Sequence, residues 1–188
     1  MVADIRRQQI LDAALEVFLR YGYRRTTMED VARQAGLSRP TLYLSFPGKQ
    51  AIFCAVVEAG QDRLLGEVQG ILQRPLTLRD RLVAVFEAWS VAPFAELSRS
   101  PAADELAGDG FTFAGDIFAD GLARLVALLA DAIADDDALP TPGPSALARA
   151  RVLVGAARGF KEIARDVEDL RGLLADQITL TVPPRDPR

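Results

Sequence analysis

The side chains best suited to chemistry lie in one short polar stretch, Arg39–Ser45. It carries a guanidinium and several hydroxyl groups, which can hydrogen-bond base edges and phosphate oxygens without making or breaking a covalent bond. Leu42 and Phe46 are expected to point inward, which leaves Arg39, Thr41, Tyr43 and Ser45 able to point outward. The stretch therefore predicts a helix that lies in the major groove of double-stranded DNA.

Catalytic chemistry has far less support in the sequence. The chain has no histidine, so a Ser-His-Asp triad and a histidine-ligated zinc site are impossible, and Cys54 is the only cysteine. We interpret Cys54 as core packing. An enzyme built on carboxylates such as Asp104 and Glu105 stays an open but weak alternative, because no acid/base pair lies in a recognisable motif. We expect no enzyme, no cofactor and no metal, and interpret the three aspartates at 135–137 as a solvated loop.

The charge is divided unevenly along the chain. The net charge is −4, but residues 1–50 hold eight Lys or Arg against five Asp or Glu, a net +3, while residues 51–188 carry −7. A basic end on an acidic body suits a protein that meets DNA with one end only. No apolar run approaches the ~20 residues that span a bilayer, and the N-terminus lacks a secretory signal. We expect a cytoplasmic protein with no membrane segment.

Helical spacing dominates the elements that must position these residues. A first helix is predicted at Ile5–Tyr21 and ended by Gly22, and Thr27 is expected to cap a second. Ser38 caps a short third helix with Pro40 in its first turn. Pro93 is expected to break or bend the fifth helix. The others are predicted over about 49–71, from Thr77, from Ser100 to Gly108, and over 115–134, 145–165 and 167–180.

The turn Ala35-Gly36-Leu37-Ser38 between two short helices signals a helix-turn-helix. We therefore predict an all-α fold. A three-helix DNA-binding head, residues 1–48, precedes a larger helical body for ligand binding and dimerisation, residues 49–188.

The head also resembles the DNA-binding domain of the TetR family of transcriptional regulators, over about Ile5–Val57. The residues that carry this resemblance are Ile10–Ala14, Phe18, Tyr21–Tyr23, Thr26–Ala32, Ala35–Ser38, Thr41–Tyr43, Phe46 and Lys49.

The resemblance implies a role for each matching position. Thr27 and Lys49 would hold phosphate, while Arg39 and Thr41 would face base edges, with Pro40 in apolar contact. Tyr43 and Ser45 would touch the backbone or a base, and Ser38 belongs to the same DNA-binding set. Ser45 departs from the larger residue common in the family, and Gly48 and Gln50 depart beside Lys49. Arg39 could instead be an ordinary solvated arginine, Tyr43 half-buried support, and Thr27 a helix cap alone.

The same resemblance implies a homodimer and a small-molecule pocket in the body. A broad apolar arc on the penultimate helix, with Gly155 and Gly159 four residues apart, supports an interface, although a thin core would also need a broad arc. On that helix we place Lys161 on the charged side, with Arg158 and Glu162. The last helix is expected to add a matching seam of Leu170, Leu173, Leu174, Gln177 and Ile178.

Aromatic residues in the middle of the body suggest a largely apolar effector site. The expected ligand residues are Phe86, Trp89, Phe111, Phe118 and Phe160, with Phe94 and Phe113 nearby in sequence; ordinary core packing is the competing interpretation for each. The whole pattern predicts a dimeric regulator on a pseudo-palindromic operator, most simply a repressor released by its ligand. The alternative is a helical ligand- or partner-binding protein without operator binding.

Overall fold

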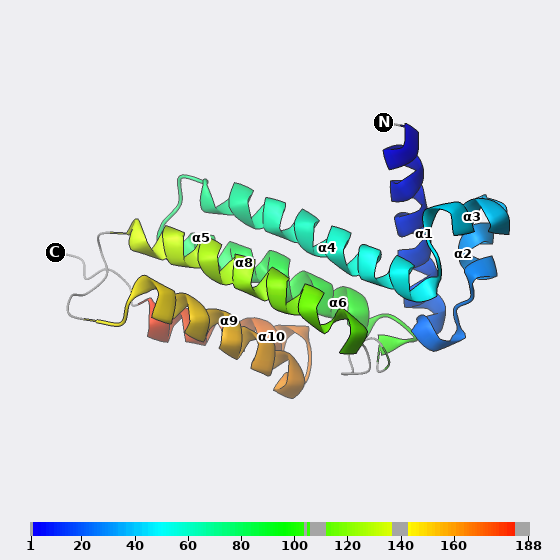
Figure 1. Cartoon of the computed structure of the whole chain (residues 1–188). Helices are drawn as coiled ribbons and strands as arrows, with labels where there is room; N and C mark the ends of the chain where they lie inside the picture. Colours follow the sequence, from blue (N-terminus) through cyan, green and yellow to red (C-terminus); the bar gives the residue numbers. More distant parts are fainter. Residues whose placement is uncertain (1, 104, 106–111, 137–142, 183–188) are drawn as a thin grey trace. The chain divides into compact units, whose positions relative to one another are not determined.

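The computed structural model describes residues 2–103, 105, 112–136 and 143–182, and every regular element in those ranges is helical (Figure 1). The predicted all-α fold is confirmed. None of the described helices is long and apolar enough to cross a membrane. Packing divides the chain into two compact units: unit 1 contains residues 1–61 and 96–118, and unit 2 contains residues 62–95 and 119–188.

The division by packing does not fall between residues 48 and 49, because α4 (Lys49–Leu72) runs without interruption and its residues up to Gln61 pack with unit 1. The boundary at 48, as a division between functions, stays a prediction.

Unit 1 is built on α1 (Val2–Arg25), α2 (Met28–Gln34), α3 (Arg39–Ser45) and the first part of α4 (Figure 1). The predicted stop at Gly22 is present as a kink: Gly22 adopts φ +78°, a conformation that favours glycine, and the chain turns there before α2. The core of this unit is a single apolar cluster with buried residues from all four helices and from Ala114, and its fully buried members are Ile10, Ala14, Val31, Leu42, Ile52 and Ala114.

Unit 2 has a separate apolar core. Its elements are the rest of α4, α5 (Leu78–Phe86), the π-helix η1 (Glu87–Val91), the start of α6 (Ala92–Ser98), most of α8 (Gly115–Ala134), α9 (Ala146–Ile163) and α10 (Val167–Thr181). The helix boundaries agree with those predicted to within a few residues. Thr77, Ser145 and Asp166 each cap the helix that follows, because their side chains accept a backbone N–H three residues on.

The expected break at Pro93 takes another form. The helix widens into η1 and resumes as α6, so Pro93 lies in the first turn of α6. Proline has no backbone N–H to donate and its ring crowds the preceding turn, and the wider turn of η1 lies directly before it in the same continuous helix. The helix predicted from Ser100 to Gly108, by contrast, falls largely outside the described residues.

One prediction about the last helices is wrong and another holds only in part. The charged cluster on one side of α9 is present by angle, but Lys161 at its edge is half-buried, because at 100° per residue it lies between the buried Ala157 and the exposed Arg158. In the proposed α10 seam, Leu170, Leu174, Gln177 and Ile178 are already buried inside the single chain, where Gln177 donates to two carbonyls of α9. Only Leu173 is partly accessible.

Candidate nucleic-acid interface

The turn between α2 and α3 has the geometry that the sequence predicts. Gly36 adopts φ +66°, and its N–H and that of Leu37 close the end of α2 by donating to Arg33 and Ala32 carbonyls at 3.2 and 2.9 Å. The Gln9 side chain donates to the Ala35 carbonyl at 2.8 Å, which ties α1 to the turn. The left-handed conformation of Gly36 and these hydrogen bonds therefore fix the angle at which α3 leaves α2.

Thr27 forms a reciprocal cap with Asp30 at the start of α2. Its hydroxyl accepts the Asp30 N–H at 3.2 Å and donates to the Asp30 carboxylate at 2.6 Å, and its own N–H donates to that carboxylate at 3.0 Å. These bonds from Thr27 hold the pKa of Asp30 below its ordinary value. The capping role of Thr27 is thus present, while its phosphate contact stays a prediction.

Ser38 caps α3 in the same manner. Its side chain accepts the Thr41 N–H at 3.3 Å and lies 2.7 Å from the Thr41 hydroxyl, with Pro40 in the first turn. Thr41 is therefore partly engaged in capping as well as half-exposed. Ser38 and Pro40 are both exposed, so capping leaves them on the surface of the head.

The inner face of α3 is as predicted: Leu42 is 0% exposed and Phe46 is buried in the core of unit 1. Arg39, Tyr43 and Ser45 are all exposed, and the Arg39 guanidinium lies 5.7 Å from the centre of the Tyr43 ring. Sequence reasoning omitted Leu44, which is 88% exposed. The signal was available, because Leu44 lies midway between the two inward residues, Leu42 and Phe46.

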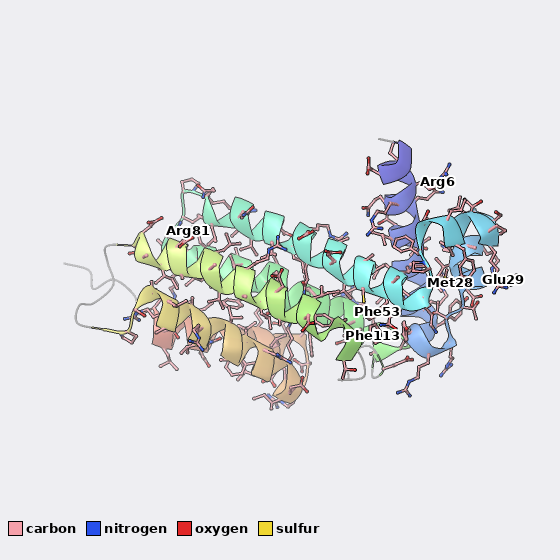
Figure 2. The ribbon with its side chains drawn as sticks, viewed as in Figure 1. Arg6, Met28, Glu29, Phe53, Arg81 and Phe113 are labelled. Carbon is pink, nitrogen blue, oxygen red and sulfur yellow. The ribbon has the colours of Figure 1, made fainter. Side chains whose placement is uncertain are left out.

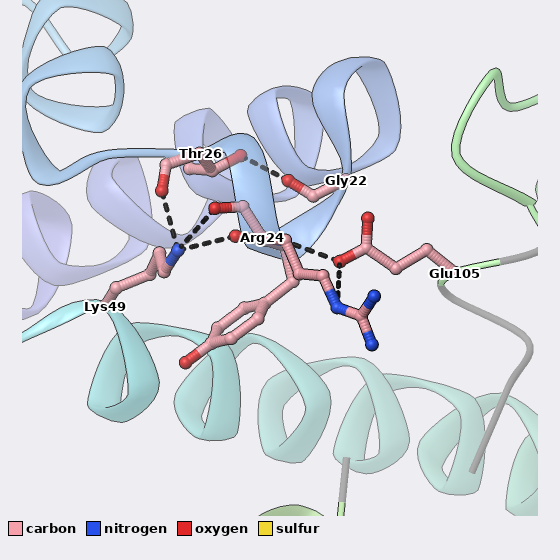
Figure 3. Close-up of polar contacts among 6 residues, drawn as sticks. Gly22, Arg24, Thr26, Lys49 and Glu105 are labelled. Atoms are coloured by element: carbon pink, nitrogen blue, oxygen red, sulfur yellow. Dashed lines mark hydrogen bonds and ion pairs between the residues drawn. The ribbon is translucent and has the colours of Figure 1, made fainter. Parts of the chain in front are cut away.

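Lys49 has an unexpected position. Its ammonium donates to the carbonyls of Tyr23, Arg24 and Thr26 at 2.6, 3.2 and 2.8 Å, and lies 4.4 Å from the centre of the Tyr23 ring (Figure 3). Partial burial lowers its pKa. The donors needed for the predicted phosphate contact are therefore already occupied, and that contact stays a prediction.

A carboxylate from a distant part of unit 1 reaches the same turn. Glu105 accepts the Arg24 N–H at 2.7 Å (Figure 3), and a Cβ at Gly22 would lie only 2.2 Å from its Oε2. Ser100 donates to the Leu19 carbonyl at 2.5 Å. The turn that presents α2 and α3 is thus held by Lys49 and by Glu105, and Ser100 binds the end of α1 just before it. Asp104, the other carboxylate considered for catalysis, lies outside the described residues.

Residues 10–56 match the model of the bacterial regulatory proteins of the tetR family. The matched segment contains the whole α2–turn–α3 arrangement, with Gly36 and both capped helices. Over this segment the chain is similar to the tetR family of bacterial regulatory proteins.

Known proteins similar to the chain agree with this assignment. The transcriptional activator FasR of Mycolicibacterium smegmatis is 40% identical over 86 residues, which are 46% of this chain and 39% of FasR. The chain thus matches less than half the length of this curated TetR-family relative. Over nearly the whole chain the likeness is one of fold: a transcriptional regulator from Cytophaga hutchinsonii has a TM-score of 0.78 at 20% identity, covering 93% of this chain and 95% of that one.

A third similar protein is SmeT, described as the repressor of the Stenotrophomonas maltophilia multidrug efflux pump SmeDEF. It is 23% identical, with a TM-score of 0.69 that covers 93% of this chain and 88% of SmeT. The similar proteins are regulators, and their printed names include both an activator and a repressor.

The aromatic residues expected to line a ligand site are not all together. Phe86 is fully buried in the core of unit 2, and Trp89 and Phe160 are half-buried against that same core. Phe118 belongs to unit 1 and is exposed, and Phe111 lies outside the described residues. Trp89 and Phe160 therefore remain the best placed of the five, and all five stay predictions as ligand residues.

Another aromatic group packs within unit 1. The ring of Phe53 lies 5.3, 5.1 and 5.7 Å from those of Phe18, Tyr23 and Phe113, and Figure 2 shows Phe53 beside Phe113. Cys54 is half-buried next to this group, and burial raises the pKa of its thiol. This environment fits the core-packing interpretation of Cys54.

Proposed function

We propose that this protein is a transcriptional regulator that binds double-stranded DNA with α3 in the major groove. The observation that carries the proposal is the exposed surface of α3, which presents Arg39 and Tyr43 from a helix anchored by Leu42 and Phe46. The net charge of +3 over residues 1–50 would supply the attraction to phosphate, and the matches to TetR-family regulators support the same function.

The protein acts as a homodimer on a pseudo-palindromic operator, and α9 supports this part of the proposal. Its apolar arc has two sides: Leu153 and Ala157 face the core, whereas Val152 and Ile163 are exposed. Gly155 and Gly159 lie on the exposed side, and a Cβ at either would meet nothing in the described residues within 4 Å. A second α9 could approach closely there, and a two-fold dimer would present two copies of α3 to two half-sites.

A small, largely apolar effector binds unit 2 and releases the protein from its operator, so the regulator is a repressor. Half-buried Trp89 and Phe160 on one core support an apolar site. Ligand and DNA would weaken each other reciprocally, because each favours a different conformation of the same protein.

The direct test is selection of bound sequences from a random DNA pool at a stated salt concentration, followed by fluorescence anisotropy. We expect a two-fold symmetric consensus and an affinity that falls with salt by a slope of about −0.9 for each phosphate neutralised. Arg39→Ala and Tyr43→Ala should each weaken binding at least tenfold, whereas Arg151→Ala on α9 should not. Absence of any salt-dependent, sequence-selective binding would refute the function. Sedimentation of the free protein as a single chain at micromolar concentration would refute the dimer.

A further inference from the structure

An apolar side chain stands at the centre of the surface that α3 offers to solvent. Leu44 is 88% exposed, and Leu42 and Phe46, both buried, lie two residues before and after it. At 100° per residue this spacing directs Leu44 away from the core of unit 1. Leu44 therefore projects from α3 in the direction in which a docked DNA duplex would lie.

Leu44 does not stand alone on this surface. Pro40, one turn earlier, is also exposed, and residues four apart are neighbours on a helix surface. Arg39 and Tyr43 flank this apolar pair on one side, with Thr41 and Ser45 on the other. Single exposed leucines are ordinary on protein surfaces, but this one is surrounded by the groups best suited to hydrogen-bond DNA.

The chemistry of the major groove restricts what such a side chain can recognise. Leucine has no hydrogen-bond donor or acceptor, so it gains nothing from the polar edges of guanine, adenine or cytosine. Thymine alone presents an apolar group there, its 5-methyl group. We infer that Leu44, together with Pro40, packs on the 5-methyl group of one thymine in each half-site. This inference rests on the proposed function, because it requires that α3 enter the major groove.

The test removes that methyl group and nothing else. In the selected operator, each thymine is replaced in turn by deoxyuridine, which keeps every hydrogen-bonding group. At one symmetric position, replacement of thymine by deoxyuridine should weaken binding of the wild-type protein about fourfold per half-site. This is the effect expected for one buried methyl group. Leu44→Ala should lose a similar factor on the thymine operator and show no further loss on the deoxyuridine operator, as a double-mutant cycle requires for a direct contact.

A matched control variant and a check that Leu44→Ala is folded make the result decisive. Leu180, 85% exposed on α10, is an equally exposed leucine outside the head, so Leu180→Ala should leave the methyl effect unchanged. Circular dichroism should show Leu44→Ala to be folded, because the residue contributes nothing to the core. If the protein selects no sequence, the proposed function fails. If it binds a sequence but no methyl effect exists, or the effect persists in Leu44→Ala, the inference about Leu44 fails.

A different observation concerns unit 2. Lys161 is half-buried on the flank of α9 that faces the core, and it forms no hydrogen bond or ion pair with any described residue. Its burial lowers its pKa. Charged groups taken out of water are normally paired, because an isolated charge loses its hydration without compensation.

A second polar group, on an element that packs against α9, also has no partner among the described residues. Ser90 is 1% exposed on η1, and its hydroxyl finds no hydrogen-bond partner among the described residues. The elements η1 and α9 pack against each other, and Trp89 and Phe160, one neighbouring each of these residues in sequence, pack half-buried on the same core. Unpaired polar groups beside half-buried aromatic rings are the composition of a ligand site.

We propose that unit 2 binds an anionic small molecule with an apolar body, whose carboxylate pairs with the Lys161 ammonium. The proposal rests on the effector part of the proposed function and narrows its chemistry. Carboxylate and ammonium would form a charge-assisted hydrogen bond in a partly dry site, while the apolar body would lie against the aromatic side chains.

Octanoate and 1-octanol are suitable probes, because they share an apolar chain and differ in charge. Octanoate should bind the wild-type protein roughly tenfold more tightly than octanol, measured by calorimetry or by the shift in unfolding temperature. Lys161→Met should abolish this preference and Lys161→Arg should retain it, while Arg151→Met, which removes an exposed charge from the same helix, should leave it unchanged. No preference in the wild-type protein, or an equal preference in Lys161→Met, would overturn the proposal. Neither result depends on DNA binding.

Discussion

The only two lysines of the chain, Lys49 in unit 1 and Lys161 in unit 2, have opposite surroundings. Both are half-buried, and burial lowers the pKa of both. Lys49 donates to three backbone carbonyls, whereas Lys161 has no partner among the described residues. The first ammonium stabilises the turn before α2, because that turn supplies an acceptor for every donor. The second loses hydration energy on folding and gains no partner among the described residues in return.

This difference separates a structural charge from one available for binding. In unit 1 the polar groups at the turn satisfy one another, so the head presents α3 in a fixed direction. In unit 2, Lys161 and the Ser90 hydroxyl have no partner in the part of the chain that the structure describes, and they lie on elements that pack together. A protein that must hold its DNA-reading helix rigidly, yet accept a ligand elsewhere, would distribute its polar partners in this way.

The largest expected effect comes from removing the Lys49 ammonium. Lys49→Met leaves the carbonyls of Tyr23, Arg24 and Thr26 without this donor, and we expect it to lower the free energy of unfolding by about 3 kcal/mol. Urea unfolding followed by circular dichroism would measure this. Gln50→Met, a change at the exposed neighbouring position, is the control and should alter stability by less than about 0.5 kcal/mol. Equal stability of Lys49→Met and wild type would show that water replaces the three bonds at no cost.

The same substitution in unit 2 should act in the opposite direction. Lys161→Met removes an unpaired, partly buried charge and fills its place with an apolar chain, so the free energy of unfolding at pH 7 should rise by about 1 kcal/mol. Destabilisation of Lys161→Met at pH 7 would mean that the ammonium has a partner in the folded protein, and the contrast with Lys49 would disappear.

The pH dependence of the free energy of unfolding provides a second test of the effect of the Lys161 charge. Because the folded-state pKa of Lys161 lies below its ordinary value of 10.5, the unfolded chain binds more protons between those two values. The contribution of Lys161 to the free energy of unfolding of the wild-type protein therefore rises with pH between its folded-state pKa and 10.5. The advantage of Lys161→Met over wild type should shrink as the pH approaches 10.5. An advantage that stays constant with pH would assign the effect to packing and not to charge.

The sequence predicts much of this fold because helix periodicity and capping are local. Gly22, Gly36, Thr27 and Ser38 act where their types and spacing indicate, and the helix ends fall within a few residues of the predicted ones. The surroundings of the two lysines could not be predicted in the same way. The acceptors of Lys49 lie 23 to 26 residues earlier in the chain and converge only because the backbone kinks at Gly22.

Two errors arose from weighing residue type above position on the helix. Lys161 is predicted on the charged side of α9, and its angle lies between the charged residues and the buried ones, so it is half-buried. Leu44 was omitted from the outward face of α3 because it is apolar, although the angle from Leu42 and Phe46 placed it there. In both cases the position on the helix, and not the residue type, agrees with the observed exposure.

The smallest expected effect compares two caps of the same kind, one in each unit. Thr27 and Thr77 both donate a hydroxyl to an aspartate three residues on, at 2.6 Å to Asp30 and 2.7 Å to Asp80. Replacement of either by alanine should lower the free energy of unfolding by about 1 kcal/mol. Thr27→Ala should also raise the pKa of Asp30 towards 3.8, so the stability that this carboxylate contributes would be lost at a higher pH as the solution is acidified.

The two caps differ in what they can do for DNA. If Thr27 only caps α2, Thr27→Ala and Thr77→Ala will reduce stability alike and leave operator affinity unchanged once the protein is folded. If the Thr27 hydroxyl also binds phosphate, Thr27→Ala alone will weaken binding, by a similar factor on every DNA sequence, because phosphate contacts carry no sequence information. Anisotropy measurements on the operator and on an unrelated duplex, with Thr77→Ala as the matched control for lost stability, separate these two roles of one side chain.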